Sequence, residues 1–166
     1  MATEMSVAVL TISTRSSAGL REDRSGPLAC RLAEKHLGRV VHYAVVPDSV
    51  SAIKAELIKA CDELKADLVF TLGGTGLAPM DVTPEATAAV IERPVPGIPE
   101  TLRAKSLEKT ATAMLSRAVA GARGQSLIIN MPGSERAVEE SFEIVIPALG
   151  HAVELIHGRV KDCGRA

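Results

Sequence analysis

The stretch that decides the fold is residues 67–76, which read DLVFTLGGTG. Leu68 to Leu72 are apolar or β-branched, a composition typical of a strand that is buried on both faces. Glycines follow at positions 73, 74 and 76, so the strand runs directly into a turn with few side chains. In open α/β sheets, ligands bind beyond the carboxyl ends of the strands. This stretch therefore predicts both a buried strand and the edge of the sheet where a ligand would lie.

Further strands and helices alternate along the chain. Nearly continuous apolar runs predict strands over residues 6–13 (SVAVLTIS), 40–46 (VVHYAVV) and 126–131 (SLIINM), the first of them central in a parallel sheet. Apolar residues at helical spacing predict helices over residues 27–37, 52–64, 98–116 and 135–157, with another beginning at residue 83. Alternation of this kind predicts a parallel sheet with helices on both faces, hence an α/β fold.

Three local features concern the ends of these elements. Thr83 is predicted to cap its helix, with Pro84 at the first helical position. Pro147 is expected to interrupt or kink the last helix, because proline lacks the N–H that the helix needs. Residues 117–124 fit either a helix end or a short edge strand.

Length and composition bound the function. A chain of 166 residues predicts a single domain over residues 1–166. The net charge of −1 and an aromatic content of 2% argue against nucleic acid and anionic membranes as partners. No apolar run approaches the roughly 20 residues that span a bilayer. Three widely spaced cysteines fit reduced thiols, so we expect a cytoplasmic protein; they are Cys30, Cys61 and Cys163.

The residues that follow the strands form a candidate anion site. The glycines of residues 73–76 leave backbone N–H groups open to a ligand, as in phosphate-binding turns. Ser134 follows Pro132 and Gly133 and opens a helix, where it could meet a second anion. Carboxylates at the same edge are the hard ligands that Mg²⁺ prefers. The candidates after the four strands are Ser13, Asp48, Gly73, Gly74, Thr75, Gly76, Asp81, Pro132, Gly133 and Ser134.

Each of these features also has a purely structural interpretation. The glycines could form a plain tight turn, and Asp48 and Ser134 could each cap a helix. Other chemistries are not supported by the residues: no Gly-Lys pair forms a P-loop, and no Gly-x-Ser-x-Gly elbow occurs. Cys30 and Cys61 fall on apolar helix faces, so a cysteine nucleophile is not expected.

Two longer motifs resemble a known family. Residues 72–86 (LGGTGLAPMDVTPEA) and 127–134 (LIINMPGS) resemble molybdenum cofactor biosynthesis proteins of the molybdopterin adenylyltransferase type. Residues 23–26 (DRSG), Pro47-Asp48 and residues 114–121 (MLSRAVAG) support the resemblance, which covers about residues 5–158.

The resemblance implies a fold, a reaction and a set of partners. The fold is a three-layer α/β/α sandwich with a mainly parallel central sheet, assembled as a homotrimer. The reaction is adenylyl transfer from Mg-ATP to the terminal phosphate of molybdopterin, which releases pyrophosphate. The product, adenylylated molybdopterin, would pass to a molybdenum-insertion enzyme downstream.

The resemblance also assigns roles to residues. Asp48 and Asp81 match the family's acidic catalytic pair, and Asp81 is expected to hold Mg²⁺. Residues 73–76 match the nucleotide-binding turn, while Ser13 and residues 132–134 match phosphate or pterin contacts. The chain departs from the family at Glu135-Arg136, where Pro-Lys is frequent, and at Ser49, which is often acidic. A non-catalytic molybdopterin-binding protein or a scaffold paralogue remains an alternative.

Overall fold

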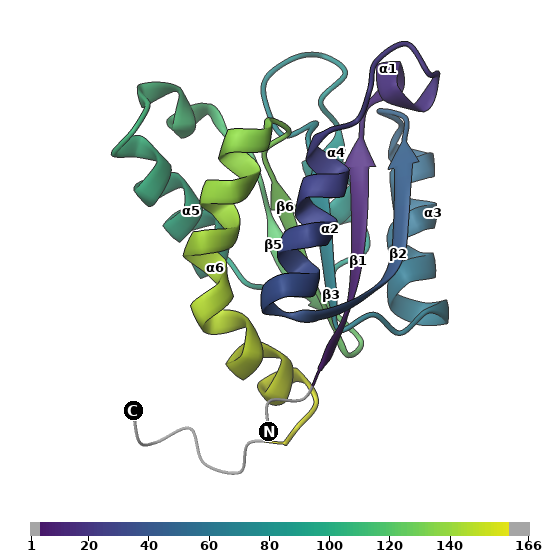
Figure 1. Cartoon of the computed structure of the whole chain (residues 1–166), viewed down its shortest axis with the longest axis vertical. Helices are drawn as coiled ribbons and strands as arrows, with labels where there is room; N and C mark the ends of the chain where they lie inside the picture. The colour runs from purple at the N-terminus through teal and green to yellow at the C-terminus, as the bar shows by residue number, and fades with distance from the viewer. Residues whose placement is uncertain (1–3, 160–166) are drawn as a thin grey trace.

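A six-stranded sheet lies at the centre of the fold, with its strands in the order β2-β1-β3-β6-β5-β4 (Figure 1). The computed structural model describes residues 4–159. Strands β1, β2, β3 and β6 run parallel, whereas β4 and β5 are antiparallel to their neighbours. The predicted, mainly parallel sheet is confirmed. The strands are β1 (Met5–Ile12), β2 (Gly38–Val46), β3 (Leu68–Leu72), β4 (Arg93–Pro94), β5 (Ala120–Arg123) and β6 (Ser126–Met131).

Helices cover both faces of the sheet and complete the predicted three layers (Figure 1). Side chains alternate along β1, so Val7 and Val9 join the core on one face and Ala8 and Leu10 the core on the other. The first face is covered by α2 (Ser25–His36), α5 (Gly97–Leu107) and α6 (Glu135–Ile156). The second face is covered by α3 (Val50–Ile58), the π-helical turn η1 (Lys59–Glu63) and α4 (Thr83–Ala88). Within residues 4–159, none of the helices has the length and apolar character needed to cross a bilayer.

Two predicted helices are each divided. The helix expected over residues 52–64 consists of α3 and then η1, where the N–H of Leu64 bonds the carbonyl of Lys59 at 3.0 Å. The helix expected over residues 98–116 ends at Leu107, and a separate 3₁₀ helix, η2 (Ala111–Leu115), follows. The division occurs because the backbone of Thr110 is extended, with φ −151° and ψ 133°.

Helix α6 runs without interruption through Pro147, so the predicted interruption at this residue is wrong, while the alternative of a kink stays a prediction. Proline in a helix interior costs about 3 kcal/mol. Here Pro147 is exposed, while apolar side chains before and after it, including Val145 and Leu149, are buried in the core. Packing on both sides of the proline therefore keeps the helix continuous.

The segment of residues 117–124 contains the short strand β5, as one of its two predicted forms requires, but this strand does not lie at the edge of the sheet. Strand β5 pairs with β6, and the two-residue β4 then pairs with β5 and forms the edge of the sheet. Strand β4 was not predicted, because a pairing of two residues leaves no periodic pattern in the sequence.

Candidate functional site

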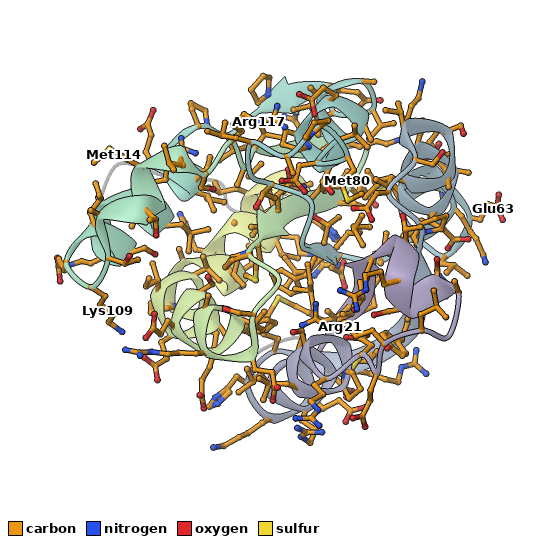
Figure 2. The ribbon with its side chains drawn as sticks, turned by 90° about the horizontal axis from the view of Figure 1, so that it is seen from above. Arg21, Glu63, Met80, Lys109, Met114 and Arg117 are labelled. Carbon is orange, nitrogen blue, oxygen red and sulfur yellow. The ribbon has the colours of Figure 1, made fainter. Side chains whose placement is uncertain are left out.

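The loops that follow β1, β3 and β6 meet at the carboxyl edge of the parallel strands, which Figure 2 shows from above. The N–H of Gly73 donates to the carbonyl of Met131 at 3.0 Å. A Cβ atom added to Gly73 would lie 2.8 Å from the carbonyl oxygen of Ile12, and one added to Gly133 would lie 3.2 Å from the Cα of Gly73. The backbones approach so closely that only glycine fits at position 73.

The glycine turn has the left-handed backbone that its sequence indicates. Gly73 has φ +98° and Gly74 has φ +66°, a region in which only glycine is free of strain. The N–H groups of Gly74, Thr75 and Gly76 have no hydrogen-bond acceptor among residues 4–159. Successive free N–H groups in a turn are the donors that an anion-binding site requires.

Asp48 lies beside this turn and does not cap α3, the helix that follows it in the chain. Its Oδ2 accepts hydrogen bonds from the backbone N and Oγ1 of Thr14, at 2.7 and 2.8 Å. Ser49 caps α3 instead, so the capping interpretation of Asp48 is wrong. The other oxygen, Oδ1, lies 3.4 Å from the place that a Cβ on Gly74 would take.

Asp81 lies beside the same turn, farther along the loop. Its Oδ2 accepts the N–H of Ala78 at 3.0 Å and lies 2.9 Å from the place of a Cβ on Gly76. In each carboxylate, Oδ1 has no hydrogen-bond donor within the part of the chain that the structure describes. The turn is therefore flanked by Asp48 and Asp81, each with one oxygen held by the protein and one open.

Thr83 has a different role from the predicted helix cap. Val82 occupies the cap position of α4, and Thr83 is fully buried. Its Oγ1 donates to the carbonyl of Gly73 at 2.9 Å, and its N–H donates to the carbonyl of Gly74 at 3.1 Å. The hydroxyl of Thr83 therefore bonds the glycine turn and holds the turn against the start of α4.

Two serines cap helices at this edge: Ser13 caps the short helix α1 (Thr14–Ser17), and Ser134 caps α6. Ser13 accepts the N–H of Ser16 at 3.2 Å, and Ser134 accepts the N–H of Ala137 at 3.3 Å, which confirms the capping interpretation of Ser134. A ligand contact by either hydroxyl stays a prediction. Ser25, a site residue that the sequence analysis missed, donates its Oγ to the carbonyl of Gly133 at 2.6 Å.

A cleft of about 370 Å³ opens beside the turn and divides the predicted site residues into two groups. Four of them line it: Thr75, Gly76, Pro132 and Ser134. The remaining six lie outside its lining: Ser13, Asp48, Gly73, Gly74, Asp81 and Gly133. The opposite wall comes from α5, η2 and α6. The polar lining residues that were not predicted from the sequence are Arg103, Ser106, Thr110, Thr112, Ser116, Asn130, Glu140 and Ser141.

Asn130 is a fully buried polar residue in the lining of this cleft. Its Nδ2 donates to the Oγ1 atoms of Thr71 and Thr87, at 2.8 and 2.9 Å, and its Oδ1 accepts the N–H of Val119 at 3.2 Å. The signal that could have found it is a lone amide in an otherwise apolar strand, because such a group is buried only with partners.

Among residues 4–159, the two cysteines, Cys30 and Cys61, are poor candidates for a nucleophile at this site. Burial raises the pKa of the Cys30 thiol and of the Cys61 thiol to about 11 in each case. Cys163 lies outside the described residues.

We expect Cys30 and Cys61 to react slowly with iodoacetamide in the native protein. At pH 8, a thiol of pKa about 11 is almost entirely protonated, and only the thiolate attacks. Mass spectrometry of the two cysteine peptides should show labelling that rises with pH up to about 11 and becomes fast after unfolding in urea. Rapid native labelling at pH 7 would contradict the assigned burial.

The carboxylates of Asp48 and Asp81 fit a Mg²⁺ ion only if substrate phosphates and water supply its other ligands. Among residues 4–159, no group of three His, Cys, Asp or Glu side chains could enclose a metal. Mg²⁺ is usually held by one or two carboxylates together with substrate phosphates and water. The open oxygens of Asp48 and Asp81 match that donor set.

The fold and this edge are typical of a class of protein: α/β domains that bind a ligand beyond the carboxyl ends of the strands of a parallel sheet. The chain belongs to the family described as "Probable molybdopterin binding domain", which matches residues 8–151.

Named relatives are similar over most of the chain. Molybdopterin adenylyltransferase of Helicobacter pylori strain J99 is 44% identical over 154 residues, which cover 92% of this chain and 88% of that protein. Molybdopterin adenylyltransferase of Escherichia coli K12 is 38% identical over 154 residues, which cover 92% of this chain and 78% of that protein. The crystal structure of the molybdopterin biosynthesis enzyme MoaB from Thermus thermophilus superposes with a TM-score of 0.87 at 43% identity, covering 93% of this chain and 97% of that one.

Proposed function

We propose that this protein is a molybdopterin adenylyltransferase that acts in molybdenum cofactor biosynthesis. The observation that carries the proposal is the 44% identity to an enzyme of that name over 92% of the chain. The glycine turn with its two flanking carboxylates gives the proposal a chemical basis, because nucleotide transfer needs donors for phosphate oxygens.

In the proposed reaction, an oxygen of the terminal phosphate of molybdopterin attacks the α-phosphorus of ATP. The new P–O bond forms as the bond to the β-phosphate oxygen breaks, which yields adenylylated molybdopterin and pyrophosphate. The attacking phosphate is already anionic, so the residues need not remove a proton. The task of the protein is to hold two anions in line and to offset their repulsion.

The chain's residues divide this task. The free N–H groups of Gly74, Thr75 and Gly76 bind phosphate oxygens of the nucleotide. Asp48 and Asp81 would hold Mg²⁺, which neutralises the charge that develops on the leaving pyrophosphate. The cleft receives molybdopterin against Pro132 and Ser134, since its mixed apolar and polar lining suits a flat heterocycle with polar edges.

The direct test is to incubate the purified protein with Mg-ATP and molybdopterin and to follow pyrophosphate. We expect release that depends on all three components. Molybdopterin binding without pyrophosphate release would instead indicate a non-catalytic binding protein or scaffold. Homotrimeric assembly and delivery of the product to a molybdenum-insertion enzyme belong to the same proposal and rest on the family resemblance. The proposed cytoplasmic location rests on the three widely spaced cysteines.

A further inference from the structure

Arg117 contacts the loop of residues 75–85 at four places. Its backbone N–H donates to the carbonyl of Thr75 at 2.8 Å. Its side chain donates from Nε to the carbonyl of Gly76 at 2.7 Å and from Nη2 to the carbonyl of Asp81 at 2.6 Å. Its Nη1 forms an ion pair with Glu85. One residue thus connects the glycine turn, the loop that carries Asp81 and the start of α4.

The loop that Arg117 holds has little other anchorage. Between the turn and Asp81, the side chains of residues 77–80 are exposed, with Leu77 at 64% and Met80 at 61%. Apolar burial therefore contributes little to the position of this segment. The loop's own hydrogen bonds join Ala78 to Asp81 and Thr83 to the glycine turn. Among the described residues, only Arg117, in the segment that leads into β5, bonds this loop from another part of the chain.

The contacts also set the direction of the amides. In a trans peptide the C=O and the following N–H point in opposite directions. Because the carbonyls of Thr75 and Gly76 point at Arg117, the N–H groups of Gly76 and Leu77 point away from it. These include an N–H that we assign to nucleotide binding.

The charge of Arg117 is already matched within the protein. Its ion pair with Glu85 lowers the pKa of that carboxyl, so Glu85 is ionised at neutral pH. A guanidinium paired with a carboxylate and bonded to two carbonyls adds little net attraction for phosphate. The geometry of Arg117 therefore suits a brace, meaning a residue that holds the loop in place, better than a positive charge that binds a ligand.

We propose that Arg117 is a positioning residue, which holds the glycine turn and Asp81 in the arrangement that receives the triphosphate. It acts through protein carbonyls and touches no substrate. The proposal rests on the proposed adenylyl transfer, and it names a residue that neither composition nor motif spacing assigns a role.

The chain offers a matched control at the opposite end of β5. Arg123 donates from Nε and Nη2 to the carboxylate of Asp62, at 3.0 and 2.7 Å, and from Nη1 to the carbonyl of Val90 at 3.0 Å. Arg123 therefore makes a similar set of bonds, but at the amino edge of the parallel strands, away from the glycine turn.

The experiment compares Arg117→Gln with Arg123→Gln by amide hydrogen exchange and by pyrophosphate kinetics. In Arg117→Gln we expect exchange at the amides of Ala78, Asp81 and Thr83 to accelerate roughly tenfold or more, because these amides report the loop. We expect kcat to fall roughly tenfold, since misplacement of about 1 Å costs up to a hundredfold. Arg123→Gln should change neither by more than twofold.

Several results would overturn the inference. Unchanged loop exchange in Arg117→Gln, with a raised KM for ATP alone, would make Arg117 a direct ligand contact. Unchanged exchange and unchanged kinetics would leave it without a role in the site. If Arg117→Gln does not fold, Glu85→Ala removes one of the four contacts and should accelerate exchange of the same amides to a smaller extent. Unchanged exchange in Glu85→Ala would count against the proposed role of Arg117. If the native protein releases no pyrophosphate, the enzymatic proposal fails, while the exchange measurements still test the brace.

Discussion

Replacement of Asp81 by asparagine is expected to lower the rate of pyrophosphate release by about two orders of magnitude or more, the cost of losing a group that stabilises developing charge. Asparagine keeps the shape of the side chain, and its amide oxygen can still accept the N–H of Ala78. The substitution removes only the negative charge that would hold the metal beside the turn. The free energy of unfolding should therefore change little, which separates a loss of chemistry from a loss of fold.

The measurement is a steady-state pyrophosphate assay over a range of Mg²⁺ concentrations. Asp62→Asn is the matched control, because Asp62 is also a carboxylate that accepts hydrogen bonds from the protein, but it lies with Arg123 at the far edge of the sheet. We expect Asp62→Asn to retain the native rate. A rate for Asp81→Asn within twofold of the native value, or an equal loss in both variants, would remove Asp81 from the proposed mechanism.

The sequence predicts the sheet and the turn well, because both depend on local patterns. The predicted strand over residues 126–131 is β6 itself, and the strand predicted from residue 67 begins at Leu68. Once these strands are parallel, their carboxyl ends must share an edge, so the residues that follow them gather there. Gly73 and Gly74 have positive φ, as a turn with two adjacent glycines suggests.

The rest of the site depends on contacts that no local pattern contains. Arg117 reaches Gly76 across 41 residues of sequence and Asp81 across 36. The far wall of the cleft comes from helices whose sequence predicts only that they are amphipathic. Thr83 is also positioned by a contact that its local sequence does not contain. Its place before Pro84 predicts a helix cap, but its hydroxyl instead donates to the carbonyl of Gly73, ten residues earlier.

Replacement of Gly74 by alanine is the second change with a large expected effect, and it tests the turn itself. A left-handed backbone costs a residue with a Cβ about 1–2 kcal/mol. The new Cβ would also lie 2.3 Å from Oγ1 of the buried Thr83, which must move and lose its bond to Gly73. We expect a loss of about 2–4 kcal/mol in the free energy of unfolding and roughly a hundredfold in kcat.

Gly124→Ala separates the cost of the left-handed backbone from the cost of the contact with Thr83. Gly124 has φ +53°, but nothing lies within 4 Å of the place its Cβ would take. Urea unfolding of both variants, with linear extrapolation to water, should therefore give a loss of only about 1–2 kcal/mol for Gly124→Ala, the cost of the backbone alone. Its pyrophosphate release should equal that of the native protein. Equal losses of stability in the two variants would mean that Thr83 moves away from the new Cβ at no cost in free energy. A native rate in Gly74→Ala would mean that the turn does not hold the nucleotide.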